Sequence, residues 1–234
     1  MLLLSGAPEL RRNFLDDLIE QTVAGFSEHR RHYKRVLSQR NTLLKNNPKN
    51  LQEQLFVWNI RLSELGGKIV RERTALIEQC NRQISQLYSQ ISGKETAISL
   101  QYSPQFPPDM YETAMLQKLE QSTQLDVLRG FTAHGPHRDD IQIEINGKLF
   151  QQSASRGETR TLVLTLKVLE LQQIEQARGL KPLLLLDDVF SELDKNRRNA
   201  LLEFVKGHQT IITTTDADVV SPKVKNVAVL STLR

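Results

Sequence analysis

The chain contains 234 residues, of which 39% are hydrophobic and 25% charged, with a formal net charge of +4, as in an ordinary globular protein of one large or two small domains. Its single cysteine, Cys80, excludes an internal disulfide and a cysteine-based metal site, and fits a reducing compartment. No apolar run is long enough to cross a membrane, and the opening Met1–Gly6 segment lacks the basic flank of a signal peptide, so we expect a cytoplasmic protein.

The first part of the chain is predicted to be a helical hairpin arm. A helix is expected to begin at or just after Pro8, and apolar residues recur at helical spacing over residues 14–92. Residues 46–50 contain a proline and break this pattern, so two long antiparallel helices are expected. Residues 66–67, two adjacent glycines, predict a bend or a close helix contact, and Trp58 is interpreted as a core anchor of the arm.

A basic segment lies inside this arm. Residues 29–52 contain seven lysines and arginines and no acid, which favours contact with phosphate. The alternative is a solvated helix face neutralised by acids elsewhere in the fold. Four of these side chains lie four residues apart in two pairs, which places them on adjacent helix stripes as candidate DNA contacts: Arg30, Arg31, Lys34 and Arg35.

The middle of the chain predicts short elements of both kinds. Ile98–Tyr102 is expected to form a strand and Met110–Ser122 a short helix. The alternating Ile141–Phe150 segment, with Asn146-Gly147 as its turn, predicts a β-hairpin.

A cluster of polar side chains precedes this hairpin. Its members are His134, His137, Arg138, Asp139 and Asp140. A metal site is conceivable, but these residues are crowded and no spacing places them on one helical face. We therefore interpret the arginine and the carboxylates as a structural ion-pair network near a nucleotide or DNA surface.

The stretch at residues 181–194 organises the rest of the chain. A proline followed by four leucines predicts a short strand buried on both faces, as in a parallel sheet between helices. Such a strand delivers Asp187 and Asp188 to the carboxyl edge of the sheet, where α/β proteins bind ligands. Paired acids at this place suit Mg²⁺ and an attacking water in a nucleotide hydrolase. The alternative is a core strand that happens to end in acids.

The sequence on either side of this stretch favours a phosphate site. Residues 153–160 are small or polar and open a leucine-rich helix over residues 161–176, and the amino end of a helix attracts anions. Asp194 is the expected N-cap of a helix over residues 195–205. Residues 209–215 and 224–230 predict two further strands, which completes an α/β lobe.

This order of serine-glycine loop, helix, strand, paired acids and Ser-x-Leu-Asp is that of an ABC-type ATPase head. Together with His134–Asp140 and Thr213–Asp216, it resembles the carboxyl-terminal part of the RecF family of bacterial recombination and repair ATPases, from near Ser5 to Val220. The resemblance implies an α/β fold: a partial ABC-ATPase head lobe, with a mostly parallel sheet, helices and a β-hairpin, plus a helical hairpin arm domain. It implies that residues 1–7 belong to the ATPase lobe, that residues 8–122 form the arm, and that residues 123–234 form the carboxyl-terminal half of the ATPase domain.

The resemblance also implies site residues in an ATP-sandwiched homodimer. Asp187 would bind Mg²⁺, and Asp188 would polarise the attacking water. Thr215 stands at the place of a switch histidine, and it cannot supply an imidazole charge, so slow turnover is expected. The residues implied in ATP binding are Ser155, Arg156, Gly157 and Glu158 of the signature loop, with Asp194 and Thr215. Arg156 and Glu158 depart from the general signature sequence.

The sequence contains no Gly-x-x-x-x-Gly-Lys-Ser/Thr phosphate loop. Similarity of residues 6–16 to a segment that follows the first lobe of the family implies that about the first third of such a protein is missing, so this chain alone is expected neither to bind ATP tightly nor to hydrolyse it. The complete protein would be an ATP-dependent clamp on single-strand/double-strand DNA that helps load recombinase, with RecO and RecR as implied partners. The alternatives are a non-catalytic structural or partner-binding fragment, and a relative of the SMC or RecN type, which the short arm disfavours.

Overall fold

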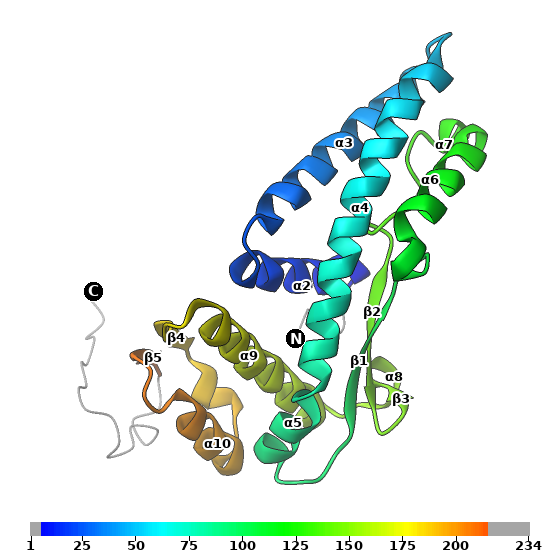
Figure 1. Cartoon of the computed structure of the whole chain (residues 1–234). Helices are drawn as coiled ribbons and strands as arrows, with labels where there is room; N and C mark the ends of the chain where they lie inside the picture. The colour runs from blue at the N-terminus through cyan, green and yellow to red at the C-terminus, as the bar shows by residue number, and fades with distance from the viewer. Residues whose placement is uncertain (1–5, 215–234) are drawn as a thin grey trace, which may run out of the picture.

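The computed structural model describes residues 6–214, in which a helical arm projects from an α/β part (Figure 1). The chain begins with α2 (Pro8–Thr22), and the arm consists of the antiparallel helices α3 (Phe26–Asn46) and α4 (Leu51–Asn81). The predicted break between the arm helices is confirmed: Asn47 ends α3 with a left-handed φ of 42°. The predicted helices are shorter than expected, because Gly25 (φ 82°) separates α2 from α3, and α5 (Ile84–Ser92) is distinct from α4.

The two adjacent glycines of α4 mark a close helix contact and do not interrupt the helix. A Cβ atom on Gly67 would lie 2.4 Å from Cγ of Glu112, and one on Gly66 would lie 3.0 Å from Sδ of Met115. Both neighbours belong to α6 (Tyr111–Gln121), which follows the short 3₁₀ helix Pro108–Met110 and packs along α4. Larger side chains would therefore push the two helices apart.

An antiparallel sheet lies at the base of the arm. Its strands are β1 (Ile98–Ser103), β2 (Asp140–Ile145) and β3 (Lys148–Leu149), in that order. The predicted hairpin is confirmed, because Asn146 (φ 50°) and Gly147 (φ 75°) form the turn between β2 and β3 with two positive φ angles. Because β1 pairs with β2, this sheet joins the two sides of the predicted domain boundary at residue 122.

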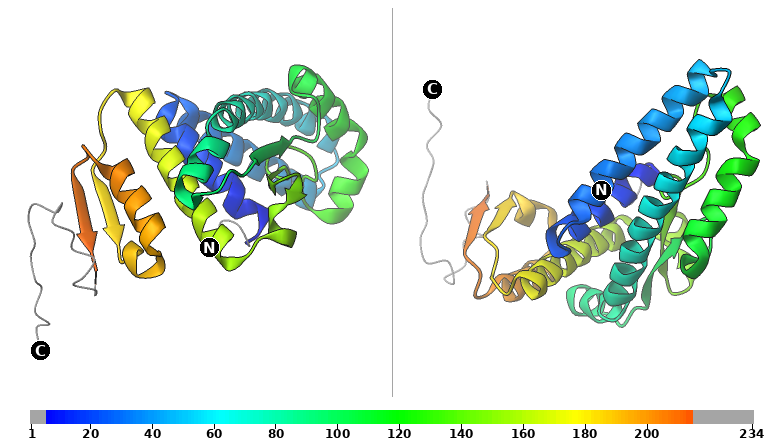
Figure 2. Two further views of the ribbon diagram at one scale, coloured as in Figure 1. Left: turned by 90° about the horizontal axis from the view of Figure 1, so that it is seen from below. Right: turned by 45° about the horizontal axis from the view of Figure 1, so that its top comes forward.

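Further helices complete the described part of the chain. They are α7 (Thr123–Arg129), α8 (Phe150–Ser153), α9 (Arg156–Arg178) and α10 (Lys195–Val205), with a short 3₁₀ helix at Val189–Glu192. Of these, α8 and α9 lie between the two sheets in sequence. Figure 2 places α10 together with the two strands of the second sheet, beside α9. That sheet consists of β4 (Leu184–Asp187) and β5 (Thr210–Thr213), which are parallel. Parallel pairing in the described residues is thus limited to β4 and β5, and the larger sheet is antiparallel.

The expectation that the leucine strand is buried on both faces is wrong for the described residues. Leu184 and Leu186 are half-buried, and Leu186 packs on the core, whereas Leu185 is 70% exposed. Ile211 on the neighbouring strand is 53% exposed. The physical reason is that β4 and β5 have helices against only one face within residues 6–214.

The main core joins the base of the arm to α9. It contains apolar side chains of α2, α4, α5, α9, β1 and β2, with Trp58 half-buried against it. A second, small cluster of Leu44, Leu51 and Leu55 closes the tip of the arm. Of the helices in the described residues, none is long and apolar enough to span a bilayer.

Candidate functional site

The amino end of α9 is held by a reciprocal cap. The Glu158 N–H donates to the Ser155 hydroxyl oxygen (3.3 Å), and the Ser155 N–H donates to a Glu158 carboxylate oxygen (2.7 Å). The Ser155 hydroxyl also donates to the Glu158 carboxylate (2.7 Å), and the N–H and hydroxyl of Ser155 together lower the pKa of Glu158. Ser155 and Arg156 are exposed at this helix end, where the first N–H groups have no intrahelical acceptors, so an anion can approach. The Glu158 carboxylate already uses part of this donor capacity, which leaves Arg156 as the added positive charge.

The paired acids lie at the end of β4, where β5 fixes their orientation. The Thr213 hydroxyl donates to Oδ1 of Asp187 (2.5 Å), and the Asp188 N–H donates to the Thr213 carbonyl oxygen (3.1 Å). Asp188 has a left-handed φ of 47°, which turns the chain sharply out of the strand. Both residues are exposed.

The surroundings of Asp187 limit the kind of cation that it can hold. Among residues 6–214, no three His, Cys, Asp or Glu side chains converge as a metal site. Mg²⁺ commonly binds one or two carboxylates and completes its octahedron with water and substrate phosphates. The acid pair therefore fits a Mg²⁺ ion that arrives with a nucleotide and does not fit an all-protein cage.

The predicted N-cap of α10 is confirmed. Asp194 accepts a hydrogen bond from the Arg197 N–H (3.0 Å), and this bond lowers the pKa of Asp194. Arg197 also donates to the carbonyl oxygen of Gly157 in the first turn of α9 (3.3 Å). The structure thus brings the signature loop and Asp194 together. Thr215 lies outside the described residues.

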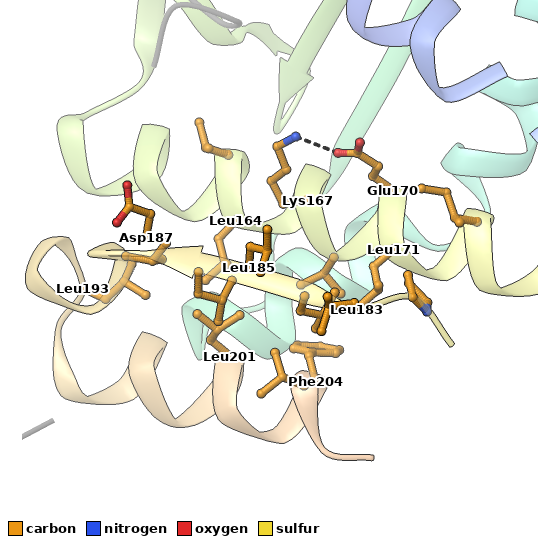
Figure 3. A pocket seen from close by; sticks show the side chains of 18 of the residues that line it. Leu164, Lys167, Glu170, Leu171, Leu183, Leu185, Asp187, Leu193, Leu201 and Phe204 are labelled. Carbon is orange, nitrogen blue, oxygen red and sulfur yellow. Dashed lines mark hydrogen bonds and ion pairs between the residues drawn. The ribbon is translucent and has the colours of Figure 1, made fainter. Parts of the chain in front are cut away.

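A groove of about 930 Å³ is lined by residues of α9, β4 and α10 (Figure 3). Leu164 and Leu171 of α9 lie on one side, Leu183 and Leu185 lie on the other, and Asp187 lies at one end. Its lining is mainly aliphatic, with Arg160 and Lys167 of α9 as its cations and Asp187 and Asp188 as acids at the end of β4. An aliphatic surface suits packing better than phosphate binding, so we take the polar loop ends beside the groove as the candidate phosphate site.

The carboxylates of the polar cluster before the hairpin belong to a structural network, but their partners come from α2 and β1 and not from Arg138 as predicted: Arg138 donates to the Thr132 carbonyl oxygen (3.4 Å) and lies over the Phe131 ring. Arg11 of α2 donates two hydrogen bonds to the Asp140 carboxylate (2.9 and 2.8 Å), which lower the pKa of Asp140. Tyr102 of β1 donates to Asp139 (2.6 Å), and Arg12 donates to the Asp139 carbonyl oxygen (2.6 Å). The network joins α2 to β1 and to the start of β2.

His137, one of the two histidines of this cluster, links α3 of the arm to the loop before β2. The ring of His137 contacts the Tyr33 hydroxyl of α3 through Nδ1 (2.7 Å) and the Thr132 carbonyl oxygen through Nε2 (3.1 Å). A carbonyl can only accept, so Nε2 carries the proton and Tyr33 donates to Nδ1. Burial, followed by nearby arginines, lowers the pKa of His137 to about 4. Gly135 (φ 132°) is needed here, because a Cβ atom would lie 2.6 Å from the Tyr33 hydroxyl.

The basic segment divides into buried and exposed side chains. Arg30 is 9% exposed and pairs with Asp17 (2.7 Å) and Glu20 (2.9 Å) of α2, so it cannot share a surface track with its neighbours. Arg40 is fully buried against Asp126 (2.9 Å). Acids elsewhere in the fold neutralise these two arginines, but both are buried and neither lies on a solvated helix face, so the prediction that Arg30 lies on a DNA track is wrong. The remaining members are exposed: Arg31, Lys34, Arg35, Lys45 and Lys49.

Comparisons with known proteins identify relatives of the chain. No family model matches the chain. It is 39% identical over 231 residues to the DNA replication and repair protein RecF of Rippkaea orientalis, covering 91% of this chain and 61% of that protein. It is 36% identical over 227 residues to RecF of Ruminiclostridium cellulolyticum, covering 93% and 61%. A solved structure described as RecF-ATP in the RecFOR pathway has a TM-score of 0.83 at 31% identity, over 92% of this chain and 60% of that chain. The chain therefore spans about three-fifths of the length of the relatives it matches.

Proposed function

Because this chain is a RecF homologue over about three-fifths of the length of its relatives, we propose that it forms the arm, signature helix and acid-pair strand of an ATP-dependent DNA repair and recombination protein. One observation carries the proposal. The amino ends of α9 and α10 are joined through Arg197, and their exposed polar residues lie in the same α/β part as the acid pair of β4. These are the elements from which an ABC-type head contacts nucleotide phosphates.

The acid pair would serve metal binding and hydrolysis. Asp187, oriented by Thr213, would hold Mg²⁺, which neutralises charge on the phosphates when it is bound. Asp188 would accept a hydrogen bond from the attacking water and orient it. Asp188 is an exposed residue at the sharp turn that ends β4.

The signature loop would act on a nucleotide held by a second copy of the protein. Ser155, Arg156 and Gly157 present a hydroxyl, a cation and helix N–H groups toward solvent, which suits the terminal phosphate of ATP. Glu158 caps this turn, and Asp194 caps the neighbouring one. Thr215 would occupy the position of the switch histidine of other ABC-type ATPases.

The open face of β4 and β5 supports a larger ATPase domain. A parallel sheet is stable when both faces are covered, yet Leu185 and Ile211 are exposed among residues 6–214. About two-fifths of the length of the RecF relative from Rippkaea orientalis lies outside the part matched here. Additional chain of that kind would cover this face and bring a phosphate-binding loop.

DNA would bind along the exposed basic residues of α3. Arg31, Lys34 and Arg35 form no ion pair within the described residues, so their charges are available to phosphates. The solved relatives are assigned to the RecFOR pathway, which supports RecO and RecR as partners in the cytoplasm. A second candidate, a non-catalytic structural or partner-binding part, is favoured by the missing phosphate-loop motif.

The test uses an extended protein, in which this chain follows the part of a full-length RecF relative that it does not match. Asp188→Asn should lower ATP turnover by roughly 10²–10⁴-fold while nucleotide affinity is kept, because it removes the water-orienting carboxylate but keeps its size. Asp109→Asn, at an exposed aspartate on the 3₁₀ helix before α6, is the matched control. Unchanged turnover in Asp188→Asn would remove this residue from the catalytic role.

A further inference from the structure

Arg197 connects two loops that lie far apart in the sequence. Its Nε donates to the Thr161 hydroxyl oxygen (2.7 Å), and one terminal nitrogen donates to the Gly157 carbonyl oxygen (3.3 Å), both in α9. Its other terminal nitrogen pairs with the Asp194 carboxylate, which caps α10. One guanidinium therefore serves acceptors on two helices, and the partners in α9 precede it by 36 and 40 residues.

The geometry of this contact requires an arginine. A guanidinium presents its N–H donors in a rigid planar fork, whereas a lysine offers one compact ammonium group on a flexible stem. The Arg197 side chain is only 23% exposed, so solvent competes weakly for its donors. The Thr161 hydroxyl accepts from Arg197 and itself donates to the Gly157 carbonyl oxygen (2.9 Å), which ties the first turn of α9 to the same group.

Helix α5 also packs beside the contact that Arg197 makes between α9 and α10. Tyr88 of α5 is buried against Thr161, and burial, then the charge of Glu158, raises the pKa of Tyr88, while Arg197 opposes this shift. Helix α5 follows α4 of the arm directly and packs on both α9 and α10. The root of the arm, the signature turn and the cap of α10 therefore converge on one partly buried contact.

We propose that Arg197 is a positioning residue that holds the signature turn and the Asp194 turn in one fixed arrangement. The inference rests on the proposed nucleotide site, because its consequence is that both turns face the same phosphate together. Arg197 touches no reacting atom in this account. Its loss would let the two turns move separately and misplace the groups that face the phosphate, without removing any of them.

The first test uses the chain itself, without nucleotide. In Arg197→Met and Arg197→Lys, hydrogen exchange at the backbone amides of residues 159–161 should become at least about tenfold faster, because the first turn of α9 loses its tie to α10. Lys195→Gln, at an exposed residue on the same turn of α10, should exchange like the wild type. Circular dichroism verifies that each variant is folded. Unchanged exchange in both Arg197 variants overturns the inference.

The second test uses the extended protein. Misplacement by about 1 Å can cost roughly 100-fold in rate, so Arg197→Met and Arg197→Lys should lower kcat by up to about that factor while KM stays within about threefold. Combining Arg197→Met with Thr161→Val should add little, because both remove the same contact. Retained kcat in either Arg197 variant, or a rise in KM alone, overturns the inference and leaves the proposed function intact. If the extended wild-type protein shows no ATP turnover, the proposed function is overturned, and this inference with it. The hydrogen-exchange result would then still report whether Arg197 ties α9 to α10.

Discussion

The depressed pKa of His137 should make the folded protein less stable in mild acid. A single substitution of this residue should remove that loss of stability. Its neutral ring accepts from Tyr33 and donates to Thr132, and burial lowers its pKa from 6.5 to about 4. A charged ring is disfavoured by burial and by the nearby arginines, Arg138, Arg12 and Arg40. The unfolded chain therefore binds a proton more readily than the folded chain between these two values.

The linkage between protonation and folding gives the sign and size of this change in the free energy of unfolding. Because the pKa of His137 is depressed in the folded state, its contribution to stability is complete above about pH 6.5 and is lost as the pH falls toward 4. At about 1.4 kcal/mol per pH unit, the full loss is roughly 3 kcal/mol, of which about 2 kcal/mol falls between about pH 7 and pH 5. With a urea slope of about 2 kcal/mol/M, the midpoint should fall by about 1 M.

The assay is urea unfolding followed by the fluorescence of Trp58, the single tryptophan, which lies in the arm. In His137→Gln, an amide can still accept and donate but cannot titrate, so about 2 kcal/mol of the loss between about pH 7 and pH 5 should disappear. His32→Gln, at an exposed histidine of α3, is the control and should lose stability as the wild type does. An equal loss in His137→Gln and the wild type would refute the assignment of this joint.

Two further predictions concern the arginines and lysines of the arm. Arg40→Met should destabilise the chain by about 3–5 kcal/mol in the same urea assay, because it strands the fully buried Asp126 carboxylate; a change below about 1 kcal/mol would contradict a buried ion pair. In the extended protein, glutamine at the three exposed positions of α3 should weaken DNA binding similarly for all sequences and reduce the salt slope by up to about 0.9 per lost phosphate contact with duplex DNA. An unchanged affinity and slope would make this stretch a solvated helix face. The three positions are Arg31, Lys34 and Arg35.

The local features of the fold could be predicted because they depend on neighbouring residues. Asp194 caps α10 over the predicted range, and Asn146-Gly147 makes the predicted turn, since caps and tight turns are set by short-range chemistry. The capping box of Ser155 and Glu158 follows the same rule. The structure also contains the predicted order of a loop, the helix α9, the strand β4 and the acid pair.

Features that depend on distant residues could not be predicted in the same way. The four-residue spacing of Arg30 and Lys34 places them on adjacent turns but does not say which side chain turns inward, and α2 supplies the acids that bury Arg30. Arg197 was missed because its partners in α9 lie 36 and 40 residues away. The spacing Asp194-x-x-Arg197, which gives the cap its N–H donor, was the local signal available. The open face of β4 could not be foreseen from an apolar run that is also typical of a fully covered strand.

In the proposed function, the signature loop contacts a nucleotide held by a second copy of the protein. This contact is tested by the mass of the extended protein in solution with ATP and with ADP, measured by light scattering after size exclusion. We predict a dimer with ATP and a monomer with ADP, and we predict that Ser155→Arg stays monomeric with ATP, because it places bulk and charge at the exposed amino end of α9. A Ser155→Arg protein that dimerises with ATP as the wild type does would contradict the account.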